Sequence, residues 1–240
     1  PLNERVPKQW KPRDFEGTVN WVSNFEQIDY SKGKWMLMTR TNKMLEPLKD
    51  FFEDKGYYYA SKKGNNLVNK DLLQAIDTWK KLNTHQLIPA KLAQKIYAFM
   101  TVKGGSVRRN FGNGSSLKNV IEDLVNIEDL RNEHGLLAAG GWERALDKIN
   151  DKKRNFIIAM EKNGEDISPM VEPRIKLSTI HGAKGDERQN TVLMLDIDYN
   201  SFTAYQKNPN PEHRLFFVGI TRTVENLYLV NPVGAYGYQI

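Results

Sequence analysis

Two polar clusters near the end of the sequence carry residue types that bind phosphates. Residues 175–187 read IKLSTIHGAKGDE, an apolar run that ends in Ser, Thr and His and leads into a lysine flanked by glycines and two acids. Polar groups at the carboxyl end of a parallel strand lie where α/β sheets bind ligands. Thr179 and His181 could donate hydrogen bonds to phosphate oxygens there. The alternative interpretation is a polar turn with a surface histidine.

The second cluster is residues 212–230, EHRLFFVGITRTVENLYLV. We expect a buried strand over 215–220 that delivers Thr221 and Arg222 at its carboxyl end, where a helix starts. An arginine on such a rigid element suits a developing negative charge on a transferring phosphoryl group. The helix dipole disfavours a cation at a helix start, so we infer that some other interaction favours the arginine there. A solvent-facing or salt-bridged arginine is the alternative.

Apolar runs and helical periodicity predict the elements that position these clusters. We expect five buried strands, at 35–38, 175–180, 192–195, 215–220 and 227–230. Helical faces follow at 44–52 and at 72–79, the latter after a cap at Asn69. The pattern at both ends predicts an α/β fold with a mostly parallel sheet flanked by helices.

The centre of the chain has little strand character. Helical patterns cover 89–100, 117–130 and 142–160. A Gly- and Ser-rich stretch at 101–116 divides this centre from the first α/β part. This pattern predicts an α-helical insert between the two α/β parts.

Composition and length exclude several classes of protein. The 240 residues are 40% hydrophobic and 27% charged, as in a soluble globular protein of one large domain or a domain with an insert. No apolar run approaches a membrane span. The absence of cysteine excludes disulfides and thiolate sites and suits a reducing cytoplasm. The sequence starts at Pro1 without an apolar leader, which fits either a processed protein or a fragment, and we expect a fragment.

Positive charge is concentrated in residues 60–118. This segment holds eleven Lys or Arg and two Asp, whereas the whole chain has a net charge of +6. Such a segment is a candidate nucleic-acid face, because Lys and Arg that neutralise phosphates release counterions. A solvated helix surface is the alternative.

Several catalytic motifs are absent from the sequence. There is no G-x-x-x-x-G-K-[ST] loop to cradle a β-phosphate, and no apolar strand ends in an Asp-Glu pair. The four histidines form no metal-binding motif, and no G-x-S-x-G elbow marks a hydrolase serine. We therefore expect no metal site in this chain.

The order of three motifs resembles a known family. STIHGAKGDE at 178–187 and EHRLFFVGITR at 212–222 are similar to motifs V and VI of UvrD/Rep-like superfamily 1 DNA helicases, and WMLMTRTNKMLEPL at 35–48 is similar to motif IVa. The resemblance implies a second RecA-like motor domain, with its first part at 1–100, a helical insert subdomain at 101–171 and the remainder at 172–240.

The resemblance also implies roles for single residues. Arg222 matches the arginine that reaches the γ-phosphate of ATP on the partner motor domain, and Glu187 matches the glutamate that contacts the ribose. Asp186 departs from the family, where glycine or leucine is usual, which puts the local ATP geometry in question. RRNFGNGSSL at 108–117 resembles a turn placed against duplex DNA, with a flexible basic loop as the alternative. The nucleic-acid contacts implied are Arg40, Asn42, Lys70, Arg108, Arg109, Thr179 and His181.

We therefore expect the C-terminal part of an ATP-dependent DNA helicase or translocase, which unwinds DNA by hydrolysing ATP at an interface with an N-terminal motor domain. That domain would hold most of the ATP and its Mg²⁺, so this chain by itself should be inactive. The expected partners are single-stranded DNA and duplex DNA at a junction. We expect the protein to be a monomer that acts in DNA repair or replication. We expect the cytoplasm of a bacterial or phage-infected cell and no membrane contact.

The rival interpretation is a non-catalytic nucleic-acid-binding or interaction module on a degenerate helicase scaffold. The presence of both Arg222 and Glu187 favours an active motor, because a scaffold has no physical need for either residue.

Overall fold

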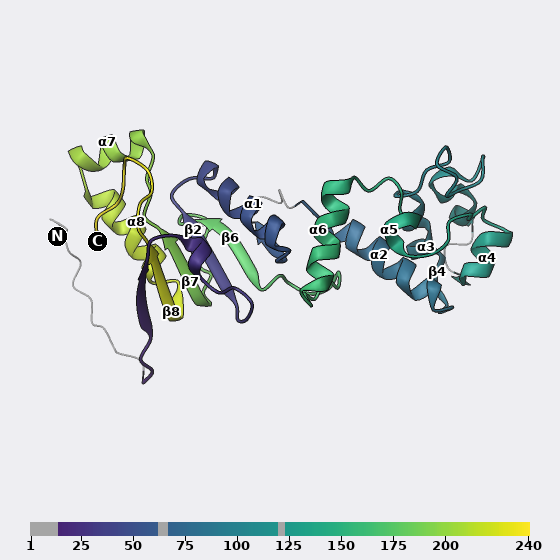
Figure 1. Cartoon of the computed structure of the whole chain (residues 1–240), viewed down its shortest axis with the longest axis horizontal. Coiled ribbons are helices and arrows are strands. Elements are labelled where there is room, and N and C mark those ends of the chain that lie inside the picture. The colour runs from purple at the N-terminus through teal and green to yellow at the C-terminus, as the bar shows by residue number, and fades with distance from the viewer. Residues whose placement is uncertain (1–13, 62–66, 120–122) are drawn as a thin grey trace. The chain divides into compact units, whose positions relative to one another are not determined.

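The computed structural model describes residues 14–61, 67–119 and 123–240. The chain divides into two compact units, with boundaries at 65/66 and 171/172 (Figure 1). We call them the sheet unit, which combines both ends of the chain, and the helical unit, which lies between them in sequence. The basic segment at 60–118 thus falls mostly in the helical unit, and its Lys62 and Lys63 lie outside the described residues.

The sheet unit is built on six parallel strands. In sheet order these are β1 (Thr18–Val22), β8 (Thr223–Val230), β7 (Arg188–Met194), β2 (Trp35–Thr39), β6 (Ile175–Thr179) and β3 (Tyr59–Ser61). Every neighbouring pair is parallel. All strands therefore begin at one edge, the amino edge, and end at the other, the carboxyl edge. This confirms the predicted α/β fold with a parallel sheet.

Helices flank this sheet. They are α1 (Glu46–Lys55), α7 (Tyr199–Lys207) and α8 (Asn210–Ile220), with short 3-10 turns at Phe25–Gln27 and Lys43–Leu45. Helix α8 lies beside β7 and β8 (Figure 1). A Cβ on Gly219 would lie 3.0 Å from Cδ1 of Leu193, which is fully buried. The glycine in α8 therefore lets the helix backbone approach the sheet closely.

The predicted strand at 215–220 is wrong, because these residues form most of α8. Its buried residues are Glu212, Leu215, Phe216 and Gly219, spaced i, i+3, i+4 and i+7. This is the pattern of one buried helical face. A short apolar run reads the same in a buried strand and a buried helix, so the run LFFVGI alone did not distinguish them.

The helical unit contains α2 (Lys70–Asn83), α3 (Ala90–Tyr97), α4 (Ile127–Asn132), α5 (Trp142–Ala145) and α6 (Asp151–Lys162). A small antiparallel pair joins β4 (Ile88–Pro89) to β5 (Leu124–Val125), and a 3-10 stretch covers Gly112–Asn119. The predicted cap is confirmed: the Asn69 side chain accepts a hydrogen bond from the Leu72 backbone N–H at 2.9 Å.

Two predicted helices differ in the structure. The stretch 117–130 holds the end of the 3-10 segment, β5 and the start of α4, while its residues 120–122 lie outside the described part. The stretch 142–160 is two helices, and α6 restarts where the Asn150 side chain caps the Lys153 N–H at 2.9 Å. Between them, the Asp147 carboxylate accepts a hydrogen bond from the Thr101 backbone N–H at 2.6 Å. This tertiary contact holds the chain in a loop that helical periodicity does not reveal.

The division between the units also differs from the predicted boundary at 100/101, because α2 and α3 belong to the helical unit. Trp79 of α2 donates its indole N–H to the Gly140 carbonyl at 3.0 Å, and Tyr97 of α3 donates its hydroxyl to the His134 carbonyl at 3.0 Å. Both aromatic side chains are fully buried. These contacts link the two helices to residues far downstream, which local sequence patterns cannot indicate.

No helix in the described ranges combines the length and the apolar character that a membrane crossing requires.

Candidate functional site

Glu187 and Arg222 lie side by side at the amino edge of the sheet. They directly precede β7 and β8, and the next residues, Arg188 and Thr223, are paired in register. The Arg188 backbone N–H donates to the Arg222 carbonyl at 3.2 Å, which fixes the two chain segments together. The Glu187 side chain is exposed and that of Arg222 is half-buried. The structure therefore brings together the two residues that the resemblance linked to ATP.

Arg222 follows the end of a helix, not the end of a strand as the sequence predicted. Its Nε donates to the Val218 carbonyl at 3.0 Å and its Nη2 donates to the Thr221 hydroxyl at 3.1 Å. A cation at a helix C-terminus is favoured by the helix dipole and by unpaired carbonyls. The expected helix start at this position is therefore wrong, and the helix C-terminus itself accounts for the cation.

Asp186, the residue that departs from the family pattern, is paired with two cations. Its carboxylate accepts hydrogen bonds from Lys176 Nζ and, at 3.0 Å, from Arg188 Nη1. Burial opposes its charge, but the hydrogen bond from Lys176 and the positive charges of Arg188 and Lys176 outweigh it and lower the pKa of the Asp186 carboxyl. Its negative charge is thus balanced locally, beside Glu187.

A pocket of about 230 Å³ lies at the carboxyl edge of the sheet. Asn42 and Thr179 both line it, so the structure brings these two predicted residues together. The Thr179 hydroxyl accepts a hydrogen bond from the Gly182 N–H at 3.1 Å. His181 follows in the turn after β6, where it is exposed and outside the pocket lining. The full lining is Asn42, Leu45, Ser61, Leu177, Ser178, Thr179 and Gly182.

Arg40 also lies at the carboxyl edge, directly after β2. Its guanidinium is held by the carboxylate of Glu212 in the first turn of α8, with Nη2 to Oε1 at 2.8 Å and Nε to Oε2 at 3.0 Å. The Glu212 side chain is 7% exposed and that of Arg40 is 20% exposed. Because these residues are 172 positions apart, no local pattern could have revealed the pair.

The remaining predicted residues belong to the helical unit. Lys70 is the exposed first residue of α2, and Arg108 and Arg109 are exposed in the loop before the 3-10 stretch. The Arg108 N–H donates to the Gly135 carbonyl at 2.8 Å, and a Cβ on Gly135 would collide with the Phe111 ring at 2.5 Å. Close packing and backbone hydrogen bonds therefore hold this basic loop.

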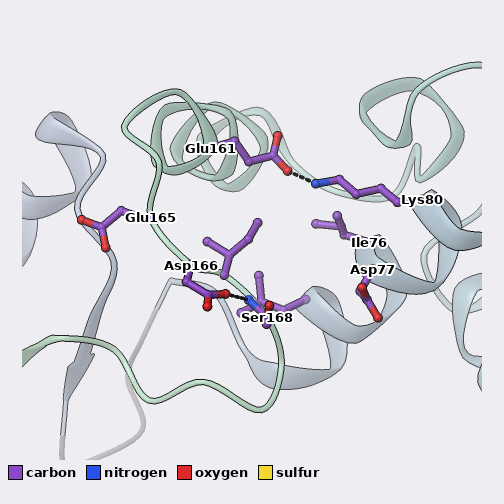
Figure 2. A pocket seen from close by; sticks show the side chains of 9 residues that line it. Ile76, Asp77, Lys80, Glu161, Glu165, Asp166 and Ser168 are labelled. Atoms are coloured by element: carbon purple, nitrogen blue, oxygen red, sulfur yellow. Dashed lines mark hydrogen bonds and ion pairs between the residues drawn. The ribbon is translucent and has the colours of Figure 1, made fainter.

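A further pocket, of about 470 Å³, lies in the helical unit and contains none of the predicted residues (Figure 2). Four carboxylates line it, and in Figure 2 that of Glu161 faces Lys80, with Oε1 and Nζ 2.6 Å apart. Excess negative charge disfavours phosphate, so this pocket does not suit nucleic acid. Its carboxylate residues are Asp77, Glu161, Glu165 and Asp166.

The described ranges contain no group of three or more His, Cys, Asp or Glu that could hold a metal ion. Sequence reasoning missed Glu212 and the serines of the carboxyl-edge pocket, Ser61 and Ser178. It also missed Lys176 and Arg188 as the partners of Asp186. A serine or an isolated glutamate has no distinctive spacing, and only the fold brings Ser61 and Glu212 beside the predicted residues.

Comparison with known proteins identifies the family. A family model, the UvrD-like helicase C-terminal domain, matches residues 24–232, whereas the search of curated proteins finds no match. The matched range includes the three motifs that carry the resemblance and most of the parallel sheet, which is consistent with a RecA-like domain. This family is part of ATP-dependent helicases, which bind nucleotide and DNA. The chain therefore belongs to the UvrD-like helicase C-terminal domain family.

Proposed function

We propose that this chain is the second motor half of an ATP-dependent DNA helicase and acts in DNA unwinding or translocation. The observation that carries the proposal is the separation of the candidate residues on one sheet. Glu187 and Arg222 lie at the amino edge, and Arg40, Asn42 and Thr179 lie at the carboxyl edge. Such an arrangement lets one rigid unit contact a nucleotide and a nucleic-acid strand at the same time.

At the amino edge, Arg222 would meet the γ-phosphate of an ATP molecule held mainly by an N-terminal motor domain. Because this sequence has no phosphate-cradling loop, the phosphates and Mg²⁺ need that second domain. The guanidinium now bonds to neutral acceptors of its own helix end, Val218 and Thr221. Neither acceptor is negatively charged, so the positive charge of the guanidinium is not neutralised by them. A negative charge that develops on the phosphoryl group would therefore attract it strongly.

At the carboxyl edge, neutral polar groups would contact single-stranded DNA. The Asn42 amide and the hydroxyl of Thr179 line one pocket, and the exposed ring of His181 follows in the same turn. Side chains of this kind bind phosphate and sugar without reading sequence. Lys70, Arg108 and Arg109 on the helical unit would add charged contacts, with the basic loop directed to duplex DNA at a junction.

The test of this proposal is Arg222→Ala in the complete protein. We expect turnover of ATP to fall about a thousandfold or more, while the affinity for single-stranded DNA changes less than twofold. The free energy of unfolding should fall by only about 1 kcal/mol, because the lost hydrogen bonds are partly exposed and have neutral acceptors. Arg131→Ala, which removes an exposed ion pair with Glu128, is the matched control and should leave both activities intact.

Loss of DNA binding with retained ATPase activity in Arg222→Ala would refute the assignment. A second check is the isolated chain, which we expect not to hydrolyse ATP. If the complete protein binds DNA but never hydrolyses ATP, the non-catalytic binding module is the correct function. Reading the coding sequence upstream of Pro1 for a phosphate-cradling loop distinguishes the two functions before any protein is made.

A further inference from the structure

The ion pair between Arg40 and Glu212 joins the carboxyl edge of the sheet to helix α8. The Arg40 guanidinium donates three hydrogen bonds to the Glu212 carboxylate, from Nε to Oε2 at 3.0 Å and to Oε1 at 3.3 Å, and from Nη2 to Oε1 at 2.8 Å. This is fork-to-fork geometry, which fixes the plane of the guanidinium as well as its position. The pair therefore orients Arg40 and does more than neutralise it.

The third nitrogen of the guanidinium is left for another acceptor. Among residues 14–61, 67–119 and 123–240, Nη1 of Arg40 has no hydrogen-bond partner. The carboxylate of Glu212 is almost completely buried, whereas the arginine side chain remains one-fifth exposed. An arginine held by two of its nitrogens and open at the third can meet a phosphate oxygen without reorganising.

Helix α8 connects this contact, at the carboxyl edge, with Arg222 at the amino edge. Glu212 lies in its first turn, where a carboxylate is favoured by the helix dipole. The next residue, His213, is fixed by a 2.8 Å hydrogen bond between its Nδ1 and the Tyr238 hydroxyl. Gly219 packs against β7 at the other end, just before Arg222. One helix, anchored along its length, therefore connects Arg40 to Arg222.

We propose that Glu212 is a positioning residue for the helicase reaction. It holds Arg40 so that Nη1 meets a phosphate of single-stranded DNA, and through α8 it links occupation of that site to the position of Arg222. This inference rests on the proposed function. The opposite role, in which Glu212 withholds Arg40 from DNA, makes the contrary prediction that removing the carboxylate tightens binding.

The test uses the complete protein and a fluorescent single-stranded oligonucleotide. Affinity is measured by anisotropy over a range of KCl concentrations, with and without a non-hydrolysable ATP analogue. Glu212→Gln keeps the side-chain shape but removes the charge. We expect the slope of log K against log[KCl] to flatten by about 0.7, the value for one phosphate contact on a single strand. We also expect the ratio of affinities with and without nucleotide to move towards one, because linkage between two sites is reciprocal.

A second variant keeps the test decisive if Glu212→Gln does not fold. Arg40→Lys retains the charge, but a lysine has no planar fork, and its ammonium would stay on Glu212. The same flattening of about 0.7 is expected. Glu128→Gln, which breaks the exposed ion pair with Arg131, is the control and should not alter the slope.

The outcomes separate the two proposals. A folded Glu212→Gln that binds DNA more tightly than wild type, or that keeps the wild-type slope and nucleotide ratio, overturns the role of Glu212 and leaves the proposed function standing. A wild-type protein that shows no salt-dependent binding of single-stranded DNA overturns both.

Discussion

Replacing Asp186 with asparagine tests whether its two cation contacts stabilise the sheet unit. The carboxylate pairs with Lys176 and Arg188, and all three side chains are about one-fifth exposed. Removing one partner costs about 3–5 kcal/mol for a fully buried pair, and an exposed pair contributes at most about 1 kcal/mol. For this intermediate burial, with two cations left facing each other, we expect Asp186→Asn to lower the free energy of unfolding by about 2 kcal/mol.

The matched control is Glu172→Gln. Glu172 also binds Arg188, with its Oε1 2.9 Å from Nη2, but its side chain is 69% exposed. Screening by solvent should limit its effect to about 0.5 kcal/mol. Hydrogen exchange of the backbone amides in β6 and β7, measured at increasing urea concentrations, reports the stability of the sheet unit separately from that of the helical unit.

The difference between wild type and Asp186→Asn should also depend on pH. The pKa of Asp186 is lowered in the folded protein, so its ionised form stabilises the fold. That contribution is fully present above the ordinary aspartate pKa of about 4 and is lost as pH falls through the lower folded value. The difference in free energy of unfolding between the two proteins should therefore be constant from pH 7 to about pH 5 and should narrow below about pH 4. Equal losses of unfolding free energy in Asp186→Asn and Glu172→Gln, or a difference from wild type that does not narrow as pH falls below about 4, would refute the reasoning.

Three further substitutions test other parts of the molecule. Gly219→Ala should destabilise the sheet unit, because overpacking costs about 1–3 kcal/mol and exceeds the gain of about 1 kcal/mol in helix propensity; an unchanged melting temperature would contradict the close approach of α8. Asn69→Ala should lower the stability of the helical unit by about 1 kcal/mol through loss of the α2 cap, measured by hydrogen exchange in that helix. Arg108→Ala combined with Arg109→Ala should flatten the salt dependence of duplex binding by about two units, and an unchanged slope would make these arginines ordinary surface residues.

Local signals in the sequence predicted the elements whose structure is decided locally. The cap at Asn69 and the apolar run at 35–38 both form as expected, because a capping side chain and a continuous buried strand need few distant partners. The run at 215–220 was misassigned because only the packing of one helical face on the sheet separates the two structures. The edge strand β1 was not predicted, since its side chains are largely exposed and give little periodic signal.

The candidate site was predictable as a set of residues but not as an arrangement. Three motifs in order identified the family, which the match over residues 24–232 confirms. They did not indicate that Arg222 would lie with Glu187 at the edge opposite Thr179, because the run at 215–220, taken as a strand, put Arg222 at a carboxyl end. Nothing in the sequence indicated that Arg40 is paired, because its buried partner, Glu212, is brought to it only by the fold.

The order of strands in the sheet has a consequence for how the protein is made. In the described sheet, β1, β2 and β3 pair only with β6, β7 and β8, and never with each other. During synthesis these three strands therefore lack their partners in this sheet until residues 175–230 leave the ribosome. The helical unit can fold during this interval, because the residues that contact one another within it are closer in sequence than the paired strands of the sheet. For that interval the apolar run WMLM at 35–38, fully buried in the finished sheet, is an exposed target for chaperones or for aggregation.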